Sequence, residues 1–305
     1  MLVHSSLSYC VNAKCYFFSN KDAHHRDRVK RLVTSKHHSW SHTRHQIEPV
    51  YQHRIVLVFS SKGIGKTHSR GAGTISQHIM FYAVRVRPDI LCTVNFLSTR
   101  TRLETANTDD KKKLIQLVQF ITSVASEGII LGGDTNHKLR IFICTDASYG
   151  VHMDGELHTG LVISLGTGPI FVKSGKQKCV TKSSFQAEIL AQSDILTTVL
   201  WVRDLVVELL GHQKPPLLLE DNKAAIQLVT NGSSTADRSK HVHIRNNFVY
   251  QFLNRGEMEI RHCPTSKMVT DLLTQPLPTH TFSILREILS KKTSGTGVSQ
   301  KSSNT

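Results

Sequence analysis

The spacing of apolar residues divides the chain into a helical stretch followed by a mixed stretch. From about residue 72 to 131 apolar positions recur at helical spacing, and "DDKKKLIQLVQFITSV" places Leu114, Leu117, Val118 and Ile121 on one helix face. From about residue 139 to 280 short apolar runs alternate with helical segments, which predicts a mixed α/β unit. The first 71 residues keep neither period over a useful length, apart from the strand-like "RIVLVF".

Five strands and four helices are expected in the mixed stretch. The strands are "LRIFICTDAS", "TGLVISLG", "PIFVKSGKQ", "PPLLLEDN" and "EMEIRHCP", with an Asp-Gly turn signal between the first two. Ser183 or Ser184 can cap a long first helix, and Gly232 ends the second. The third is "KHVHIRNNFVYQFLNRG", and Pro276 ends the fourth, "SKMVTDLLTQP". Beyond about residue 292 we expect a solvated tail.

The net charge favours a polyanionic partner. The 305 residues carry a formal charge of +15 with a pI near 9.7, which favours nucleic acid first and an anionic membrane surface second. The charge is uneven, because residues 1–70 hold twelve Lys or Arg against three acids, together with nine of the eighteen histidines. We therefore predict a basic, poorly ordered segment over residues 1–71.

Nothing in the sequence indicates export or membrane insertion. Its apolar runs are too short to span a bilayer, and the N-terminus has neither the charged start nor the sustained apolar core of a signal peptide. The six cysteines are scattered and are interpreted as free thiols in a reducing compartment. The expected location is cytoplasmic or nuclear, without membrane association.

Four acids occupy comparable places in the predicted elements. Asp146 ends the first strand, Glu188 lies in the first turns of the long helix, Asp221 ends the fourth strand, and Asp271 lies near the start of the last helix. If they converge, their mutual repulsion favours a hard divalent cation such as Mg²⁺. Two such ions about 3.5–4 Å apart can clamp both oxygens of a phosphodiester displacement. The other interpretation is that the acids are helix caps and turn formers, and alternation does not choose between Glu220 and Asp221.

Several motifs resemble one known family. Residues 139 to about 280 resemble the ribonuclease H domain that closes the polyprotein of copia-type retrotransposons. The matching pieces are the segment from "TDASYGVHMDGELHTG" to "FQAEILAQSD", then "EDNKAAIQLV", "SKHVHIRNNFV" and "CPTSKMVTDLLTQPL". Residues 72–138 resemble the C-terminal end of the reverse transcriptase, most clearly in "RVRPDILCTVNFLSTR". The resemblance covers about two thirds of the chain.

The resemblance implies a fold, an activity and a set of ligands. The fold is a ribonuclease H-like five-stranded mixed sheet flanked by helices, over residues 139–292. It follows a helical reverse-transcriptase remnant over 72–138 and precedes a tail over 293–305. In the family, the acids matching Asp146, Glu188, Asp221 and Asp271 bind two Mg²⁺ ions, for which Mn²⁺ can substitute. They cut the RNA strand of an RNA–DNA hybrid. The match selects Asp221 over Glu220.

Departures from the family pattern leave an alternative open. Phe185-Gln186, Thr270 and Gln275 replace the residues usual in the family, and each departure lies next to a presumed ligand. The paired-aspartate motif, the fingers and the palm of the polymerase are not found, so we predict no polymerase activity and a polymerase part supplied in trans. The alternative is a catalytically inactive, nucleic-acid-binding remnant of such an element.

The remaining signals are less specific. A basic run near the third strand either contacts phosphates or is a solvated sheet edge, and consists of Lys173, Lys176, Lys178 and Lys182. His241 could reach a phosphate and His262 could carry a proton. "SSKGIGKTH" suggests a nucleotide hydrolase, but Ser60 stands where the first glycine of that loop belongs and no helix pattern follows. The spacing of Cys10, Cys15 and the nearby histidines is wider than a zinc finger requires.

Overall fold

The computed structural model describes most of the chain between residues 69 and 290. The described ranges are 69–102, 107–124, 127–133, 140–152, 155–177, 179, 181, 183–211, 214–232 and 240–290. The predicted tail lies outside them, as does the predicted basic segment except for its last three residues. Those three begin the first described helix.

The helical stretch forms α4 (Ser69–Arg85), the short η2 (Pro88–Ile90), α5 (Leu91–Arg102) and α6 (Thr108–Ser123). The side chain of Asn107 accepts a hydrogen bond from the Asp110 amide, and the Asp110 carboxylate accepts one from the Asn107 amide. This capping box fixes the start of α6. The predicted apolar face of α6 is confirmed, because Leu117, Val118 and Ile121 are buried. The expectation that no helix follows "SSKGIGKTH" is wrong, since α4 begins at Ser69.

Five strands form the central sheet, in the order β5-β3-β2-β6-β7. Their bounds are β2 Phe142–Ser148, β3 His158–Ser164, β5 Pro169–Lys176, β6 Leu217–Glu220 and β7 Glu259–His262. The central strand β2 pairs antiparallel with β3 and parallel with β6. A second, two-stranded sheet joins β1 (Gly132–Gly133) to β4 (Gly166–Thr167), which ties the helical stretch to the β3–β5 hairpin.

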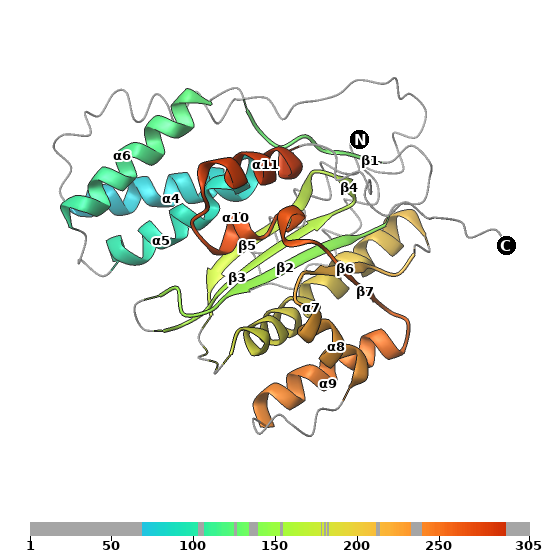
Figure 1. Ribbon diagram of the computed structural model, residues 1–305. Helices are drawn as coiled ribbons and strands as arrows, with labels where there is room; N and C mark the ends of the chain where they lie inside the picture. The colour runs from blue at the N-terminus through green and yellow to red at the C-terminus, as the bar shows by residue number, and fades with distance from the viewer. Residues whose placement is uncertain are drawn as a thin grey trace, which may run out of the picture.

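Helices cover both faces of the sheet. Figure 1 shows α7 (Ser184–Leu210), α8 (Lys223–Asn231) and α9 (Lys240–Asn254) on one side. The other side carries α4–α6, the one-turn α10 (Asp271–Thr274) and α11 (Thr279–Ser290). Alternation along β2 explains the two cores, because Ile143 packs in the core on the α7 side and Cys144 in the core that includes α4, α5 and α6. The predicted α/β fold, a five-stranded mixed sheet flanked by helices, is confirmed.

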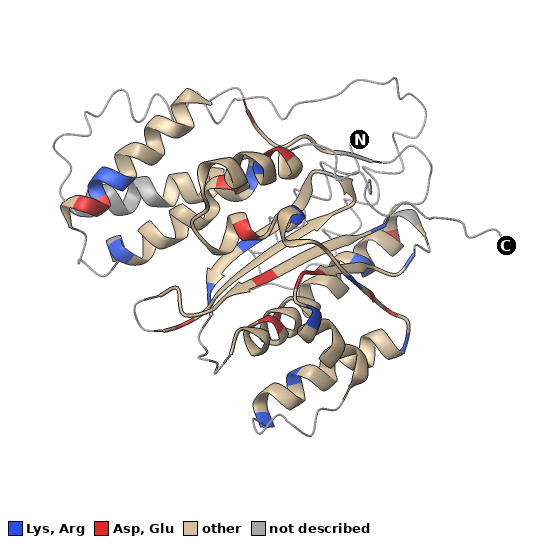
Figure 2. Ribbon diagram, viewed as in Figure 1, with Lys and Arg blue, Asp and Glu red and all other residues tan. Residues whose placement is uncertain are grey.

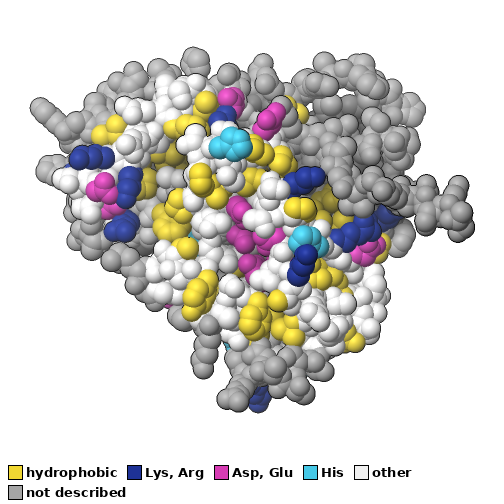
Figure 3. Space-filling view, in the orientation of Figure 1, with side chains coloured by type: hydrophobic (Ala, Val, Ile, Leu, Met, Phe, Trp, Pro, Cys, Tyr) yellow, Lys and Arg dark blue, Asp and Glu magenta, His cyan; other side chains and the backbone are white. Residues whose placement is uncertain are grey.

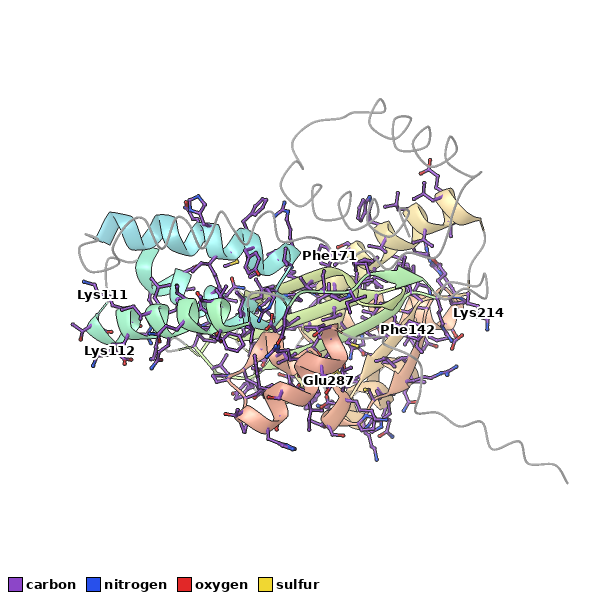
Figure 4. The ribbon with its side chains drawn as sticks, turned by 90° about the horizontal axis from the view of Figure 1, so that it is seen from above. Lys111, Lys112, Phe142, Phe171, Lys214 and Glu287 are labelled. Atoms are coloured by element: carbon purple, nitrogen blue, oxygen red, sulfur yellow. The ribbon has the colours of Figure 1, made fainter. Side chains whose placement is uncertain are left out.

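The view from above shows how far the helical stretch reaches beyond the sheet. In Figure 4, Lys111 and Lys112 point outward from α6 at the edge of the molecule, and both are exposed. Phe142 and Phe171 come from the sheet, and Glu287 from α11 on its near side. None of the helices in the described ranges is both long and apolar enough to cross a membrane.

The end of the chain differs from the prediction. "SKMVTDLLTQP" does not form one helix but breaks into the short η3 (Thr265–Lys267) and α10. A further helix, α11, follows Pro276, although the sequence reading placed no helix there. Its apolar positions Phe282, Leu285 and Leu289 keep helical spacing and pack against the core, so the signal was present. Ser183 is the N-cap of α7, but its hydroxyl makes no capping bond.

Candidate active site

Four different elements deliver the four predicted acids to one region. Asp146 lies within β2 and Glu188 in the second turn of α7. Asp221 directly follows β6, and Asp271 is the first residue of α10. Acidic side chains gather at the centre of the face in Figure 3, over the ends of the central strands. The structure therefore brings the four acids together.

Asp146 is the most heavily engaged member of this cluster. The residue is 9% exposed, and its carboxylate accepts a hydrogen bond from the Thr274 hydroxyl of α10. The backbone N–H of Ala147 favours the charged forms of both Asp146 and Glu188, and the negative charge of Asp146 opposes ionisation of Glu188. The two carboxyl groups therefore lie close enough to influence each other's ionisation.

Burial and like charge raise the pKa values of the acids. Burial raises the pKa of Asp146, the Thr274 hydrogen bond opposes the rise, and the charge of Asp221 adds to it. Burial, followed by the charges of Asp146 and Glu220, raises the pKa of Glu188 well above its ordinary value. Burial together with Asp146 and Asp221 raises the pKa of Asp271 to about 7. Mutual repulsion of this kind shows that the carboxylates lie within electrostatic reach of one another.

A fifth carboxyl group, that of Glu220, lies next to the cluster on the α7 side of the sheet. Its side chain lies on the α7 side of the sheet, where it accepts hydrogen bonds from Gln192 Nε2 at 2.7 Å and the Asn222 amide at 3.1 Å. Burial raises its pKa to about 7 against those two bonds, with further contributions from Asp221 and Asp146. Glu220 therefore points to the α7 side of the sheet, and its charge still interacts with the charges of Asp221 and Asp146.

The donor set suits a hard divalent cation. All five groups are carboxylates, which Mg²⁺ prefers, and Glu188 Oε2 is buried without a hydrogen-bond partner. Within the described ranges, however, no group of three or more His, Cys, Asp or Glu side chains is already arranged as a metal site. The acids are therefore gathered but not yet in coordination geometry. Asp221 accepts a hydrogen bond from the Thr265 hydroxyl at 2.9 Å, which steadies one of them.

The two predicted histidines have different surroundings. His262 ends β7 and stands opposite Glu220 in the parallel register, so it lies at the strand ends near the acids, with its side chain exposed. His241 lies in the first turn of α9, which packs against α7 and α8. Figure 1 shows that helix on the outer side of α7. The structure does not bring His241 to the cluster.

The predicted basic run is only partly described. Lys173 is exposed on the edge strand β5, and Lys176 forms an ion pair with Glu156 at 3.1 Å. Lys178 and Lys182 lie outside the described residues. In the register Ser174, Gly160 and Asp146 stand in one row, so the neighbouring Lys173 points to the opposite face of the sheet.

Sequence reasoning missed three residues that shape the site: Thr274, Glu220 as a coupled group, and Gly160. A Cβ on Gly160 would lie 2.8 Å from Thr274 Cγ2 and 3.0 Å from the Thr270 carbonyl oxygen. The absence of that Cβ lets α10 lie directly on β3. No local sequence signal marks these contacts, because each joins segments that are distant along the chain.

Fold and site together define an α/β protein with a carboxylate cluster at the ends of its central strands. The sequence comparisons then give its relatives. The chain is 28% identical over 231 residues to the retrovirus-related Pol polyprotein from transposon RE1 of Arabidopsis thaliana, which covers 75% of this chain and 15% of the relative. It is 29% identical over 228 residues to the Pol polyprotein from transposon RE2 of the same plant, and this match covers 73% of this chain and 15% of the relative. The inferred resemblance to copia-type Pol polyproteins is confirmed.

The chain spans about 15% of the length of these curated relatives. No protein-family model matches it. Among solved structures, a ribonuclease H1 isolated from compost by a metagenomic approach matches with 16% identity and a TM-score of 0.37, over 44% of this chain and 92% of that one. A foamy viral protease–reverse transcriptase, solved in complex with an RNA/DNA hybrid, matches with 13% identity and a TM-score of 0.42, over 75% of this chain and 28% of that one.

Proposed function

We propose that this chain is a retrotransposon-derived ribonuclease H that hydrolyses the RNA strand of RNA–DNA hybrids. The observation that carries the proposal is the convergence of Asp146, Glu188, Asp221 and Asp271 from four elements. Burial and the neighbouring carboxylates raise the pKa values of Asp146, Glu188 and Asp271. Repulsion between the gathered carboxylates lowers the stability of the fold. A reaction that depends on cations would account for such a cluster. The Pol relatives support the same assignment.

Divalent cations would supply charge stabilisation and an activated water at neutral pH. The residues of this chain would hold them. Asp146, which interacts electrostatically with the other three acids, would contribute to both ions, together with Asp271 from α10 and Asp221 from the end of β6. The Thr274 hydroxyl keeps the Asp146 carboxylate oriented, and the Ala147 amide orients Glu188. The expected products carry a 5′-phosphate and a 3′-hydroxyl.

Substrate binding would rely on charge and on the sugar. The formal charge of +15 favours the phosphate backbone, and contacts to 2′-hydroxyls across the minor groove would select the RNA strand. Lys173 and Lys176 are candidates for phosphate contacts along the sheet edge. His262, exposed at the end of β7, would move a proton near the leaving oxygen.

A second candidate is a protein that binds the hybrid without cutting it. Two observations favour it: within the described residues the acids are not arranged as a metal site, and the Asp146 carboxylate already accepts a hydrogen bond from Thr274. Both candidates predict hybrid binding that weakens steeply with salt. Only the first predicts cleavage.

The deciding experiment is an assay of the full chain on a hybrid labelled at the RNA 5′ end, with Mg²⁺, with Mn²⁺ and with EDTA. Cleavage that needs the divalent cation and leaves the DNA strand and plain duplex DNA intact supports the ribonuclease. Salt-sensitive binding without cleavage under any of these conditions favours the second candidate.

A further inference from the structure

The one-turn helix α10 lies across a row of three residues in the sheet. Asp146, Gly160 and Ser174 stand opposite one another on β2, β3 and β5. The Thr274 side chain covers the first two, since its hydroxyl bonds Asp146 and its methyl group sits where a Gly160 Cβ would be. The position of α10 over this row therefore sets where Asp271 and Thr274 meet Asp146.

A helix of four residues cannot hold this position by itself. One turn has a costly nucleus and leaves backbone groups unpaired at both ends. Its support must come from tertiary contacts, and Leu272 and Leu273 of α10 are buried in one core with Leu91 and Val94 of α5. The upstream helical stretch therefore forms part of the wall against which α10 packs.

A chain of hydrogen bonds fixes α10 on its other side. The Ser174 hydroxyl donates to the Leu273 carbonyl oxygen at 2.7 Å. Because that hydroxyl has one proton, its oxygen must accept from His158 Nε2, which lies 2.7 Å away. His158 is then the neutral Nε2–H tautomer, and its Nδ1 accepts from His152 Nε2 at 3.0 Å. Burial lowers the pKa of His158 to about 4, with the neighbouring His152 adding to the effect.

Helix α5 covers and anchors this hydrogen-bond chain. The Phe96 ring stacks on His152 and His158, with ring centroids 4.7 and 5.0 Å apart respectively. The Asn95 side-chain amide donates to the Ser174 carbonyl oxygen at 2.9 Å. These contacts cover the buried His158 imidazole and one side of the half-buried His152 ring, and they fix the backbone of Ser174 on the edge strand.

We propose that Asn95 and Phe96 are positioning residues for α10, acting through His158 and Ser174, so that the reverse-transcriptase-like stretch is a working part of the carboxylate site. The inference deepens the proposed function, on which it rests. It assigns a role in the site to residues that lie on a helix preceding the whole sheet. A purely structural role for α5 would instead stabilise every part of the fold alike.

The test compares four variants of the full chain. Phe96→Ala removes the stacking ring and Phe96→Tyr restores it. Ser174→Ala removes the single hydroxyl that links His158 to α10. Ile115→Ala is the matched control, because Ile115 belongs to the same helical stretch but is 38% exposed on α6. The measurements are hydrogen exchange of the Leu273 and Gln275 amides relative to β2 in EDTA, and the Mg²⁺ concentration at the midpoint of thermal stabilisation.

Phe96→Ala and Ser174→Ala should raise exchange in α10 about tenfold while β2 stays protected, and should raise the Mg²⁺ midpoint about tenfold, as loss of an outer support of a metal ligand does. Phe96→Tyr and Ile115→Ala should match the wild type. Equal loss of protection in α10 and β2, or unchanged exchange and midpoint in folded Ser174→Ala, would overturn the proposal. If Phe96→Ala does not fold, Ser174→Ala alone decides.

The two proposals fail separately. A wild type that shows neither Mg²⁺ stabilisation nor cleavage contradicts the proposed function. The exchange of α10 amides is measured without metal, so it still decides whether α5 positions that helix.

Discussion

Two groups of charged side chains, each with buried members, differ in how the fold balances their charge. Between η2 and α11, charges alternate in sign: Arg87 donates to both Asp89 carboxylate oxygens, at 2.9 and 2.7 Å, and Arg286 bridges Asp89 and Glu127. At the strand ends, acids gather alone, and within the described ranges none of the four pairs with Lys or Arg. Figure 2 shows blue and red side by side at α11, and red on β2, α7 and α10.

The two groups differ in whether a side chain of opposite charge lies beside each buried charge. Burial alone would lower the pKa of the Arg87 guanidinium, but the hydrogen bonds and charge of Asp89 outweigh it and raise that pKa. The protein thus supplies its own counter-charge between η2 and α11. Within the described ranges no Lys or Arg pairs with the four acids, and the pKa values of Glu188 and Asp271 rise instead. Acids without a counter-charge from the protein are what the proposed cation site would require.

The largest expected effect comes from breaking the like-charged cluster. Asp146→Asn keeps the shape and the acceptor for Thr274 but removes one charge from the centre. Hybrid cleavage should fall about 10⁴-fold or more, because the ligand common to the two ions is lost. The melting temperature in EDTA should stay unchanged or rise, since one source of repulsion is gone. Single-turnover cleavage and thermal melting with and without Mg²⁺ check both parts.

Asp204→Asn serves as the control, because Asp204 is an exposed acid on α7. It should leave cleavage and the Mg²⁺ response unchanged. An Asp146→Asn protein that responds to Mg²⁺ as strongly as the wild type would show that the acids do not form one site.

Breaking the network of alternating charges formed by Arg87, Asp89, Arg286 and Glu127 should lower stability in a way that Mg²⁺ does not reverse. Arg87→Met leaves Asp89 buried with one guanidinium fewer, so the free energy of unfolding should fall by about 3 to 5 kcal/mol. Added Mg²⁺ should not restore this loss, since the cation binds elsewhere. Denaturant titration measures it.

Lys113→Met is the control, because it removes the exposed ion pair with Asp109 on α6. It should leave stability unchanged. A loss equal to that of Arg87→Met would refute the distinction between buried and exposed pairs.

The smallest expected effect is a pH dependence of the free energy of unfolding, which should come from the acidic cluster alone. The pKa values of Asp271 and Glu220 are raised to about 7, so the folded protein holds protons there that the unfolded chain has released. Stability is therefore present at lower pH and is lost as pH rises through 7. Between pH 6.5 and 8 in EDTA the loss should be about 1 kcal/mol. Denaturant titrations at the two pH values, with saturating Mg²⁺ as comparison, measure it.

Mg²⁺ should remove most of this slope, because a bound cation keeps the carboxylates ionised at both pH values. Asp271→Asn should reduce it without metal. A slope that survives both treatments would come from groups outside the cluster.

The sequence by itself determined the elements and the places of the four acids. Alternation and helical spacing are local patterns, so they located all five strands of the sheet, the helices α7–α9 and the buried face of α6. The positions of Asp221 after β6 and Asp271 at the start of α10 follow from the same local patterns. Asp146, predicted to end its strand, lies two residues before the end of β2. Even the missed helix α11 carried a local signal in the spacing of Phe282, Leu285 and Leu289.

Tertiary structure alone decided how those pieces form a site. The hydrogen bond from Thr274 to Asp146 joins residues 128 positions apart, and that from Asn95 to Ser174 joins residues 79 apart. The inclusion of Glu220 depends on burial, which no strand pattern specifies. The short α10 exists because β3 and α5 enclose it, not because its four residues favour a helix. Such contacts depend on which surfaces meet after folding, and a local pattern carries no record of its distant partner.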